Sequence, residues 1–117
     1  MRNFRELEVW KDARLLVKET YKLTNSLPDS EKYGLTSQIN RAVISIPANI
    51  AEGCSKYSQK DFIRFLQISL GSSYELETHT ILCQDLEFIN QNVASPIIGD
   101  IQSLQKRISS LIKYNKS

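Results

Sequence analysis

The chain has 117 residues and a formal net charge of +2; 41% of its residues are hydrophobic and 24% are charged. This length suits one domain with its own core, so we expect residues 1–117 to form a single domain that needs neither a disulfide nor a metal to fold. The composition excludes a disordered chain, and no stretch reaches the roughly 20 apolar residues of a membrane span. A charge of +2 is too small to indicate a nucleic-acid partner by itself.

Two features favour the cytoplasm. Cys54 and Cys83 are far apart and form no CxxC motif, which predicts reduced thiols. The first residues, MRNFRELEVWKD, contain acidic side chains and no apolar run, unlike a signal peptide. We therefore expect a cytoplasmic protein with no membrane partner.

The first predicted helix runs from about Leu7 to Ser26. Its apolar positions alternate at spacings of four and three residues, which places on one stripe Val9, Ala13, Leu16, Thr20, Leu23 and Leu27. The proline-bearing segment SLPDS, at residues 26–30, ends it. Such a stripe predicts a helix that packs along one side of a bundle.

The second predicted helix carries one apolar face and ends at Gly53, a residue typical of the position just after a helix. That face consists of Leu35, Ile39, Ala42, Val43, Ile46 and Ile50. Pro47 lies inside the helix, where proline removes one backbone hydrogen bond and crowds the preceding turn. The sequence therefore predicts a kink or break at Pro47.

The third predicted helix follows the segment GCSKYS at residues 53–58. Ser58 is the expected N-cap, Asp61 is expected to reach back to it, and Tyr57 is expected to pack on Phe62. The helix then continues to about Leu86.

The fourth predicted helix follows the last break, NQNVASP at residues 90–96. Ser95 is its expected N-cap and Pro96 its first residue, where a missing N–H costs nothing. Its apolar face consists of Ile97, Ile101, Leu104, Ile108 and Leu111. Short connections between long helices make neighbours antiparallel, so the predicted fold is all-α: an antiparallel up-down-up-down four-helix bundle with a proline-kinked second helix.

Surplus apolar side chains predict an interface between copies of the chain. The core face of the third helix contains Phe62, Phe65, Leu66, Leu76 and Cys83, with Ser69 and Ser73 between them. At about 100° per residue, other apolar residues of this helix lie on nearly the opposite side. With residues beside the stripe of the first helix, they form the expected interface: Trp10, Val17, Tyr21, Ile68, Leu82 and Leu86. The alternative is that these are the scattered exposed apolar residues found on most proteins.

Basic residues at helical spacing suggest phosphate contacts. The candidate nucleic-acid-binding residues are Lys11, Arg14, Lys18 and Lys22 in the first helix and Lys56, Lys60 and Arg64 in the third. Such contacts would give salt-sensitive binding that does not depend on sequence. The alternative is a solvated helix face, because Glu8, Asp12 and Glu19 lie beside the first stripe.

Polar residues along the second helix predict a structural network. Glu77 falls on the apolar side of the third helix, and a buried carboxylate needs a partner. Arg41 or the backbone freed by Pro47 is the expected partner. We interpret Arg41, Asn49, Glu52 and Glu77 as this network, with a ligand site as the alternative.

No residue pattern indicates catalysis. Bundle di-iron sites use paired Glu-x-x-His motifs, whereas His79 is the only histidine and Glu75 lies four residues before it. Cys83 has the place of a packed core thiol, and the four glycines are isolated, so no phosphate loop exists. We expect no enzyme activity, catalytic residue, metal, cofactor or small-molecule substrate.

Several segments resemble one bacterial family. They are FRELEVWKDA at residues 4–13, EKYGLTSQINRA at 31–42, IPANIAEG at 46–53 and FIRFLQISLGSSYELET at 62–78. This combination is similar to the four-helix-bundle proteins encoded in intervening sequences of 23S ribosomal RNA genes. That name describes a genomic association and does not make the protein a ribosome component.

The resemblance implies a four-helix bundle that assembles as a ring, a homopentamer. The family is also similar in fold to the accessory protein of diversity-generating retroelements, which is thought to bind nucleic acid beside a reverse transcriptase. The leading hypothesis is therefore a non-enzymatic, homo-oligomeric accessory protein that binds RNA or DNA. The alternative is a protein–protein interaction scaffold without nucleic-acid binding.

Overall fold

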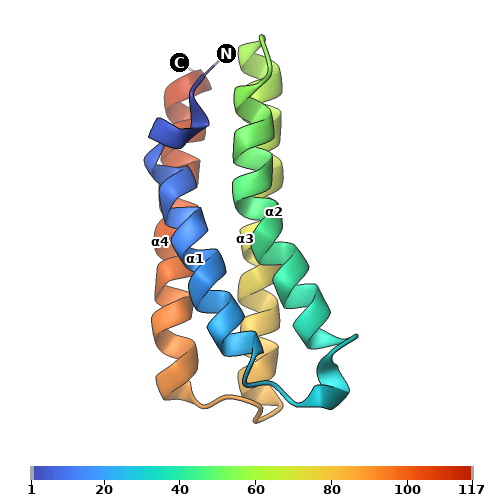
Figure 1. Ribbon diagram of the computed structural model, residues 1–117. Helices are drawn as coiled ribbons and strands as arrows, with labels where there is room; N and C mark the ends of the chain where they lie inside the picture. Colours follow the sequence, from blue (N-terminus) through green and yellow to red (C-terminus); the bar gives the residue numbers. More distant parts are fainter. Residues whose placement is uncertain (1, 117) are drawn as a thin grey trace.

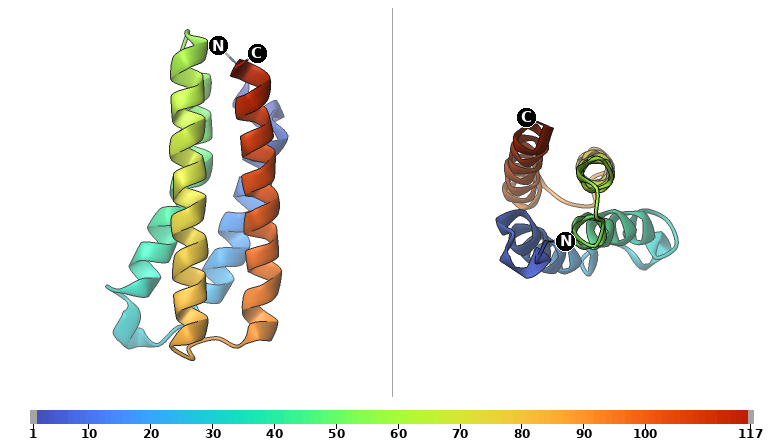
Figure 2. Two further views of the ribbon diagram at one scale, coloured as in Figure 1. Left: turned by 180° about the vertical axis from the view of Figure 1, so that it is seen from behind. Right: turned by 90° about the horizontal axis from the view of Figure 1, so that it is seen from above.

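The computed structural model describes residues 2–116 and confirms the all-α, four-helix prediction. Its helices are α1 (Glu8–Thr24), α2 (Leu35–Cys54), α3 (Gln59–Asp85) and α4 (Gln91–Lys116), with short 3-10 turns η1 (Phe4–Glu6) and η2 (Asp29–Glu31). In Figure 1 the chain descends through α1, ascends α2, descends α3 and ascends α4. Each helix packs on two others: α1 and α3 both contact α2 and α4 (Figure 2). The molecule is a rod of 43 × 23 × 19 Å.

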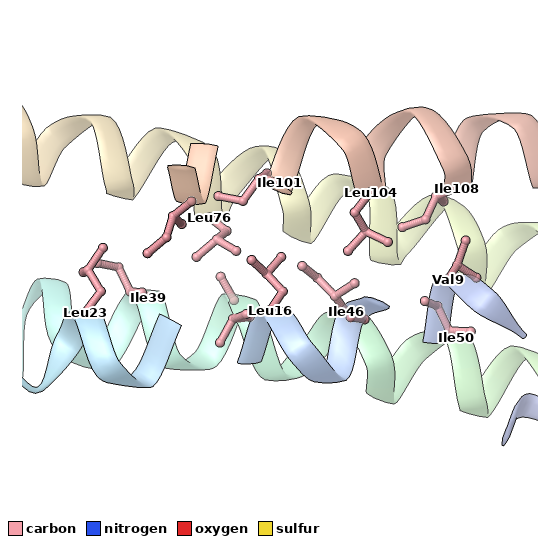
Figure 3. Packing of buried hydrophobic residues seen from close by; sticks show 14 of the residues in the cluster. Val9, Leu16, Leu23, Ile39, Ile46, Ile50, Leu76, Ile101, Leu104 and Ile108 are labelled. Atoms are coloured by element: carbon pink, nitrogen blue, oxygen red, sulfur yellow. The ribbon is translucent and has the colours of Figure 1, made fainter. Parts of the chain in front are cut away.

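The core lies along the axis of this rod, where the apolar stripes of all four helices meet. Figure 3 shows the labelled side chains of α1 and α2 pointing toward those of α3 and α4. Fully buried members include Ile39, Ile46, Leu66, Leu76 and Ile108. Burial of each such side chain contributes about 1.5–3 kcal/mol. The predicted stripe of α1 is confirmed, because all its members are buried.

The α2 helix continues without interruption through Pro47. Figure 1 shows the first half of α2 leaning away from the line of its second half. One residue before the proline, the Ile46 carbonyl accepts a hydrogen bond of 2.8 Å from the buried Ser69 hydroxyl of α3. A break at Pro47 is therefore wrong, and a kink caused by it stays a prediction.

Gly53 does not end α2, contrary to the prediction. The helix includes Gly53 and ends at Cys54, and the glycine is buried. A Cβ atom built on Gly53 would lie 2.8 Å from the Phe65 Cβ and 3.4 Å from the Phe62 carbonyl oxygen. This position needs glycine because α3 approaches the α2 backbone closely.

The start of α3 matches one part of the predicted signature. The Ser58 side chain accepts a hydrogen bond of 3.1 Å from the Asp61 amide, which confirms the N-cap. Tyr57 is 88% exposed, so its predicted packing on Phe62 is wrong. The helix ends at Asp85, and Glu87 follows with a left-handed φ of 63°.

The α4 helix begins at Gln91, four residues before the predicted cap. The Asn90 side chain accepts a hydrogen bond of 3.1 Å from the Val93 amide and caps the helix. This earlier start buries Ala94, which is 0% exposed. Ser95 and Pro96 therefore lie inside α4 and do not cap it.

Candidate functional site

Two basic residues of α1 are paired with acidic neighbours on the same helix. The Lys11 Nζ lies 3.4 Å from Glu8 Oε1, and the Lys22 Nζ lies 3.4 Å from Glu19 Oε1. Exposed pairs of this kind contribute little to stability but reduce the local positive potential. The α1 stripe is therefore a weakened candidate for phosphate binding.

The other basic residues of α1 differ in their surroundings. The Arg14 guanidinium lies 4.9 Å from the centre of the Trp10 ring, a cation–π arrangement. Lys18 is exposed. On the same helix, Asp12 accepts a hydrogen bond from the α4 residue Arg107, so its charge is also compensated.

The basic residues near the start of α3 gather around one ring. Lys56 Nζ lies 5.2 Å, and the Arg64 guanidinium 4.6 Å, from the centre of the Phe65 ring. Arg64 Nε also lies 3.8 Å from Asp61 Oδ1, and Lys60 is exposed. The fold thus brings Lys56 and Arg64 together on a nearly buried aromatic residue.

These residues belong to a basic end of the rod. We define the terminal end as residues 2–8, 50–66 and 109–116, which contain the first and the last described residues and the α2–α3 turn (Figures 1 and 2). It carries seven basic and four acidic residues. The opposite, loop end, residues 24–35 and 80–95, carries one basic and four acidic residues. The bundle is therefore charged oppositely at its two ends.

Side-chain contacts hold the three segments of the terminal end together. The Arg2 guanidinium lies 3.8 Å from the centre of the Phe62 ring, and its N–H groups donate to the Gln59 side-chain oxygen. The Gln59 amide donates in turn to the backbone oxygen of Asn115, at 3.0 Å. Arg2 was not among the predicted residues, because it precedes the first predicted helix and so belongs to neither basic stripe.

A shallow apolar groove of about 490 Å³ runs between α1 and α2. Its lining residues are Phe4, Trp10, Arg14, Val17, Ile44, Pro47, Ala48 and Ala51. The Phe4 and Trp10 rings meet edge to face, with centres 5.0 Å apart. The groove contains Trp10 and Val17 of the predicted interface. Its lining residues on α2 were not predicted as part of that interface. Tyr21, further along α1, is 36% exposed.

The predicted interface residues of α3 form a separate exposed surface. Ile68, Leu82 and Leu86 are 41%, 40% and 57% exposed. At about 100° per residue they lie on one flank of the exposed side of α3. The middle of that side is polar and contains Lys60, Gln67, Thr78 and Asp85. The exposed side of α3 is therefore not uniformly apolar, and the expected interface on its flank stays a prediction.

Glu77 is hydrogen-bonded to α4 and not to the predicted partners on α2. Its two carboxylate oxygens accept from the side-chain amides of Gln102 (3.0 Å) and Gln105 (2.9 Å). Arg41 is exposed. The predicted partner of Glu77 is wrong, because the rotation of α3 in the bundle turns this carboxylate toward α4.

The other members of the predicted network also lie apart from Glu77. The Asn49 side-chain amide donates to the Ser45 carbonyl of its own helix, at 2.8 Å. Glu52 is exposed at the end of α2. The four residues therefore do not form one network.

We predict that Glu77→Ala lowers the free energy of unfolding by about 1–3 kcal/mol, because it leaves the nearly buried Gln105 amide without its acceptor. Glu75→Ala, at an exposed position two residues earlier, is expected to change it by less than about 0.5 kcal/mol. Urea unfolding of the two variants measures both effects. Unchanged stability of Glu77→Ala with weakened binding of a partner would assign this residue to a ligand site.

The two cysteines are buried free thiols. Burial raises the pKa of both the Cys54 and the Cys83 thiol. A protonated thiol is a poor nucleophile, which agrees with the interpretation of Cys83 as a core residue.

One histidine with a buried ring nitrogen lies outside the groups described so far. His79 Nδ1 is buried and has no hydrogen-bond partner among residues 2–116. Within the same residues, no three or more His, Cys, Asp or Glu side chains are grouped so that they could hold a metal ion. None of the described helices combines the length and the apolar character needed to span a membrane.

Comparison with known proteins provides evidence on the family of this chain. A family model described as 23S rRNA-intervening sequence protein matches residues 5–110. The chain is also similar to a crystal structure of a protein with unknown function, from the S23 ribosomal protein family from Bacteroides thetaiotaomicron. The two are 29% identical with a TM-score of 0.84, and the match covers 90% of this chain and 98% of that chain. No curated protein matches the sequence.

Proposed function

This chain belongs to the 23S rRNA-intervening sequence protein family, and from that premise we propose that it is a non-enzymatic, cytoplasmic, homo-oligomeric accessory protein that binds RNA or DNA. The observation that carries the proposal is the concentration of basic residues at the terminal end. Lys56, Lys60 and Arg64, three of the seven residues predicted to contact phosphate, lie there. Of the α1 residues, Lys11 and Lys22 make a smaller contribution, because Glu8 and Glu19 compensate their charges.

Two apolar surfaces on different sides of the bundle support self-assembly. The α1–α2 groove is one surface, and the flank of α3 with Ile68, Leu82 and Leu86 is the other. When unlike surfaces meet, the contact is head-to-tail, and repetition of it generates a ring if the rotation closes. The number of five subunits comes from the family resemblance. A ring would repeat the terminal end in every subunit and so raise the avidity for a long polyanion.

A polarisation titration tests nucleic-acid binding. The probe is a fluorescein-labelled RNA hairpin with a single-stranded tail, so that both forms of RNA are offered. We expect an affinity that falls roughly tenfold or more between about 50 and 200 mM salt, as for several phosphate contacts. The triple variant Lys56→Gln, Lys60→Gln, Arg64→Gln should bind more weakly and with a smaller salt dependence.

Two comparisons make this titration specific. Lys32→Gln removes a charge from the loop end and is expected to leave the affinity unchanged. The triple variant Lys11→Gln, Arg14→Gln, Lys18→Gln tests the α1 stripe and is expected to have the smaller effect of the two triple variants. No binding of the wild-type protein at low salt would refute the proposal.

The α1–α2 groove favours one alternative, a protein-binding scaffold without a nucleic-acid role. Its lining is largely apolar and partly aromatic, and Ile44 in it is 46% exposed. In that case the purified protein would bind no RNA at low salt, and the groove would receive a segment of another protein.

A further inference from the structure

Exposed aromatic rings accompany the charge at the terminal end. Tyr57, in the turn between α2 and α3, is 88% exposed, and Tyr114, near the end of α4, is 78% exposed. Tyr57 lies between Lys56 and Lys60 in the sequence. An exposed aromatic ring beside cations has the two properties that a single nucleic-acid strand requires, a face for a base and charges for its phosphates.

The turn that carries Tyr57 is fixed at its α3 side. The Ser58 side chain caps α3 by accepting from the Asp61 amide, at 3.1 Å. The next residue, Gln59, is tied to the end of α4 by its 3.0 Å hydrogen bond to Asn115. A ring on a fixed turn loses little conformational freedom when a base stacks on it.

The neighbouring cations are also held in place. Lys56 and Arg64 both lie over the ring of Phe65, which is 8% exposed and therefore part of the packed bundle. Cation–π contact positions the two side chains without neutralising their charge, and of the two only Arg64 also has an acidic neighbour among the described residues, Asp61, at 3.8 Å. Acidic residues are fewer than basic ones at this end, so the net field there attracts phosphate.

We propose that the terminal end binds a single strand of RNA or DNA in preference to a duplex, with a base stacked on Tyr57 and phosphates on Lys56, Lys60 and Arg64. This inference rests on the proposed nucleic-acid-binding function and specifies the form of its ligand. A duplex hides the faces of its bases in the stack, so it offers phosphates to this end but nothing to the tyrosine. Reading of a duplex groove uses an inserted helix or strand pair, whereas this end presents a short turn and helix termini.

Tyr33 is a matched control. It is 88% exposed, the same as Tyr57, but it lies at the loop end beside Asp29 and Glu31. Lys32 Nζ lies 5.5 Å from the centre of its ring, so it too has a neighbouring cation. The two tyrosines differ in the charge of the surrounding end, in their position in the bundle and in the contact of Lys32 with the Tyr33 ring.

Polarisation titrations with the full chain test the proposal. The single-stranded probes are labelled oligothymidine and oligouridine of about 16 nucleotides, the upper range for one single-strand site. The duplex probe is a labelled hairpin of the same number of nucleotides. All titrations are made at low salt. We expect tighter binding of the single strands than of the duplex. Tyr57→Ala should weaken single-strand binding by roughly five- to one-hundredfold, the loss typical of one stacked base, while Tyr33→Ala leaves it unchanged. Tyr57→Phe should retain binding.

Each other outcome has a distinct meaning. Equal affinity for strand and duplex, or equal effects of Tyr57→Ala and Tyr33→Ala, would overturn this inference while nucleic-acid binding itself stands. If no probe binds at low salt, the proposed function fails, and this inference fails with it. Unchanged circular-dichroism melting of both alanine variants confirms that they fold, as expected at such exposed positions.

Discussion

Replacement of Ile68 and Leu82 together by glutamate is expected to dissociate the proposed assembly into folded monomers of 13.4 kDa. Both side chains are about two-fifths exposed in the single chain, so a charge at either position is solvated when the bundle stands alone. In an assembly that covers this flank of α3, each carboxylate loses its water without gaining a partner. The cost of such unpaired burial is several kcal/mol per charge. Light scattering on the wild type and the double variant measures the masses.

The polar middle of the same helix supplies the control for this experiment. Gln67→Glu with Thr78→Glu adds the same charge to α3 at exposed positions outside the apolar flank. This variant is expected to keep the wild-type mass. An unchanged mass for the Ile68 and Leu82 variant would place the interface elsewhere, and a monomeric wild type at micromolar concentration would remove the assembly altogether.

Gly53→Ala is expected to lower the free energy of unfolding by about 1–3 kcal/mol, the usual cost of overpacking a core. The added Cβ would lie 2.8 Å from the Phe65 Cβ, a distance that requires the two helices to move apart. Alanine also has the better helix propensity, by up to about 1 kcal/mol, but that gain is smaller than the expected packing cost. Urea unfolding at a fixed protein concentration is the appropriate measurement, because self-association would shift the midpoint.

Gly71 is the control for Gly53, because a side chain added there meets open space among residues 2–116. It lies in the exposed middle of α3, and a Cβ there meets no atom within 4 Å among the described residues. Gly71→Ala should therefore raise the free energy of unfolding by about 0.5–1 kcal/mol. If both alanine variants were equally stabilised, the close approach of α2 and α3 at Gly53 would be incorrect.

Sequence patterns that have a single physical interpretation predicted much of the fold correctly. The four-and-three spacing of α1 correctly identified its buried residues except Thr24, because a helix of 3.6 residues per turn has only one face that such a stripe can bury. The Ser58 cap was equally clear, since a serine followed by a long amphipathic segment satisfies an amide that would otherwise be unpaired.

Sequence patterns that have two possible interpretations led to wrong helix ends in α2 and α4. The pair Ser95 and Pro96 is typical of a helix start, but Asn90 can cap as well and its earlier start buries Ala94. A glycine such as Gly53 either ends a helix or admits a neighbouring one, and the distance to Phe65 that decides between them exists only in the folded bundle.

The candidate sites depended even more on tertiary arrangement. The partners of Glu77 lie on α4, and no local pattern gives the rotation of α3 that points it there. The charge of the terminal end comes from three segments that are distant in the sequence. Spacing along single helices therefore found the basic groups near α3 but missed Arg2.

The most direct test of a nucleic-acid-binding assembly measures mass and binding in one sample. Sedimentation velocity with a labelled single strand follows the strand and the protein separately. We expect the strand to co-sediment at low salt with a protein species several times larger than the 13.4 kDa chain, and to be released at high salt. A strand that sediments alone in the presence of excess protein at low salt, or one that moves with a single 13.4 kDa chain, would contradict this account.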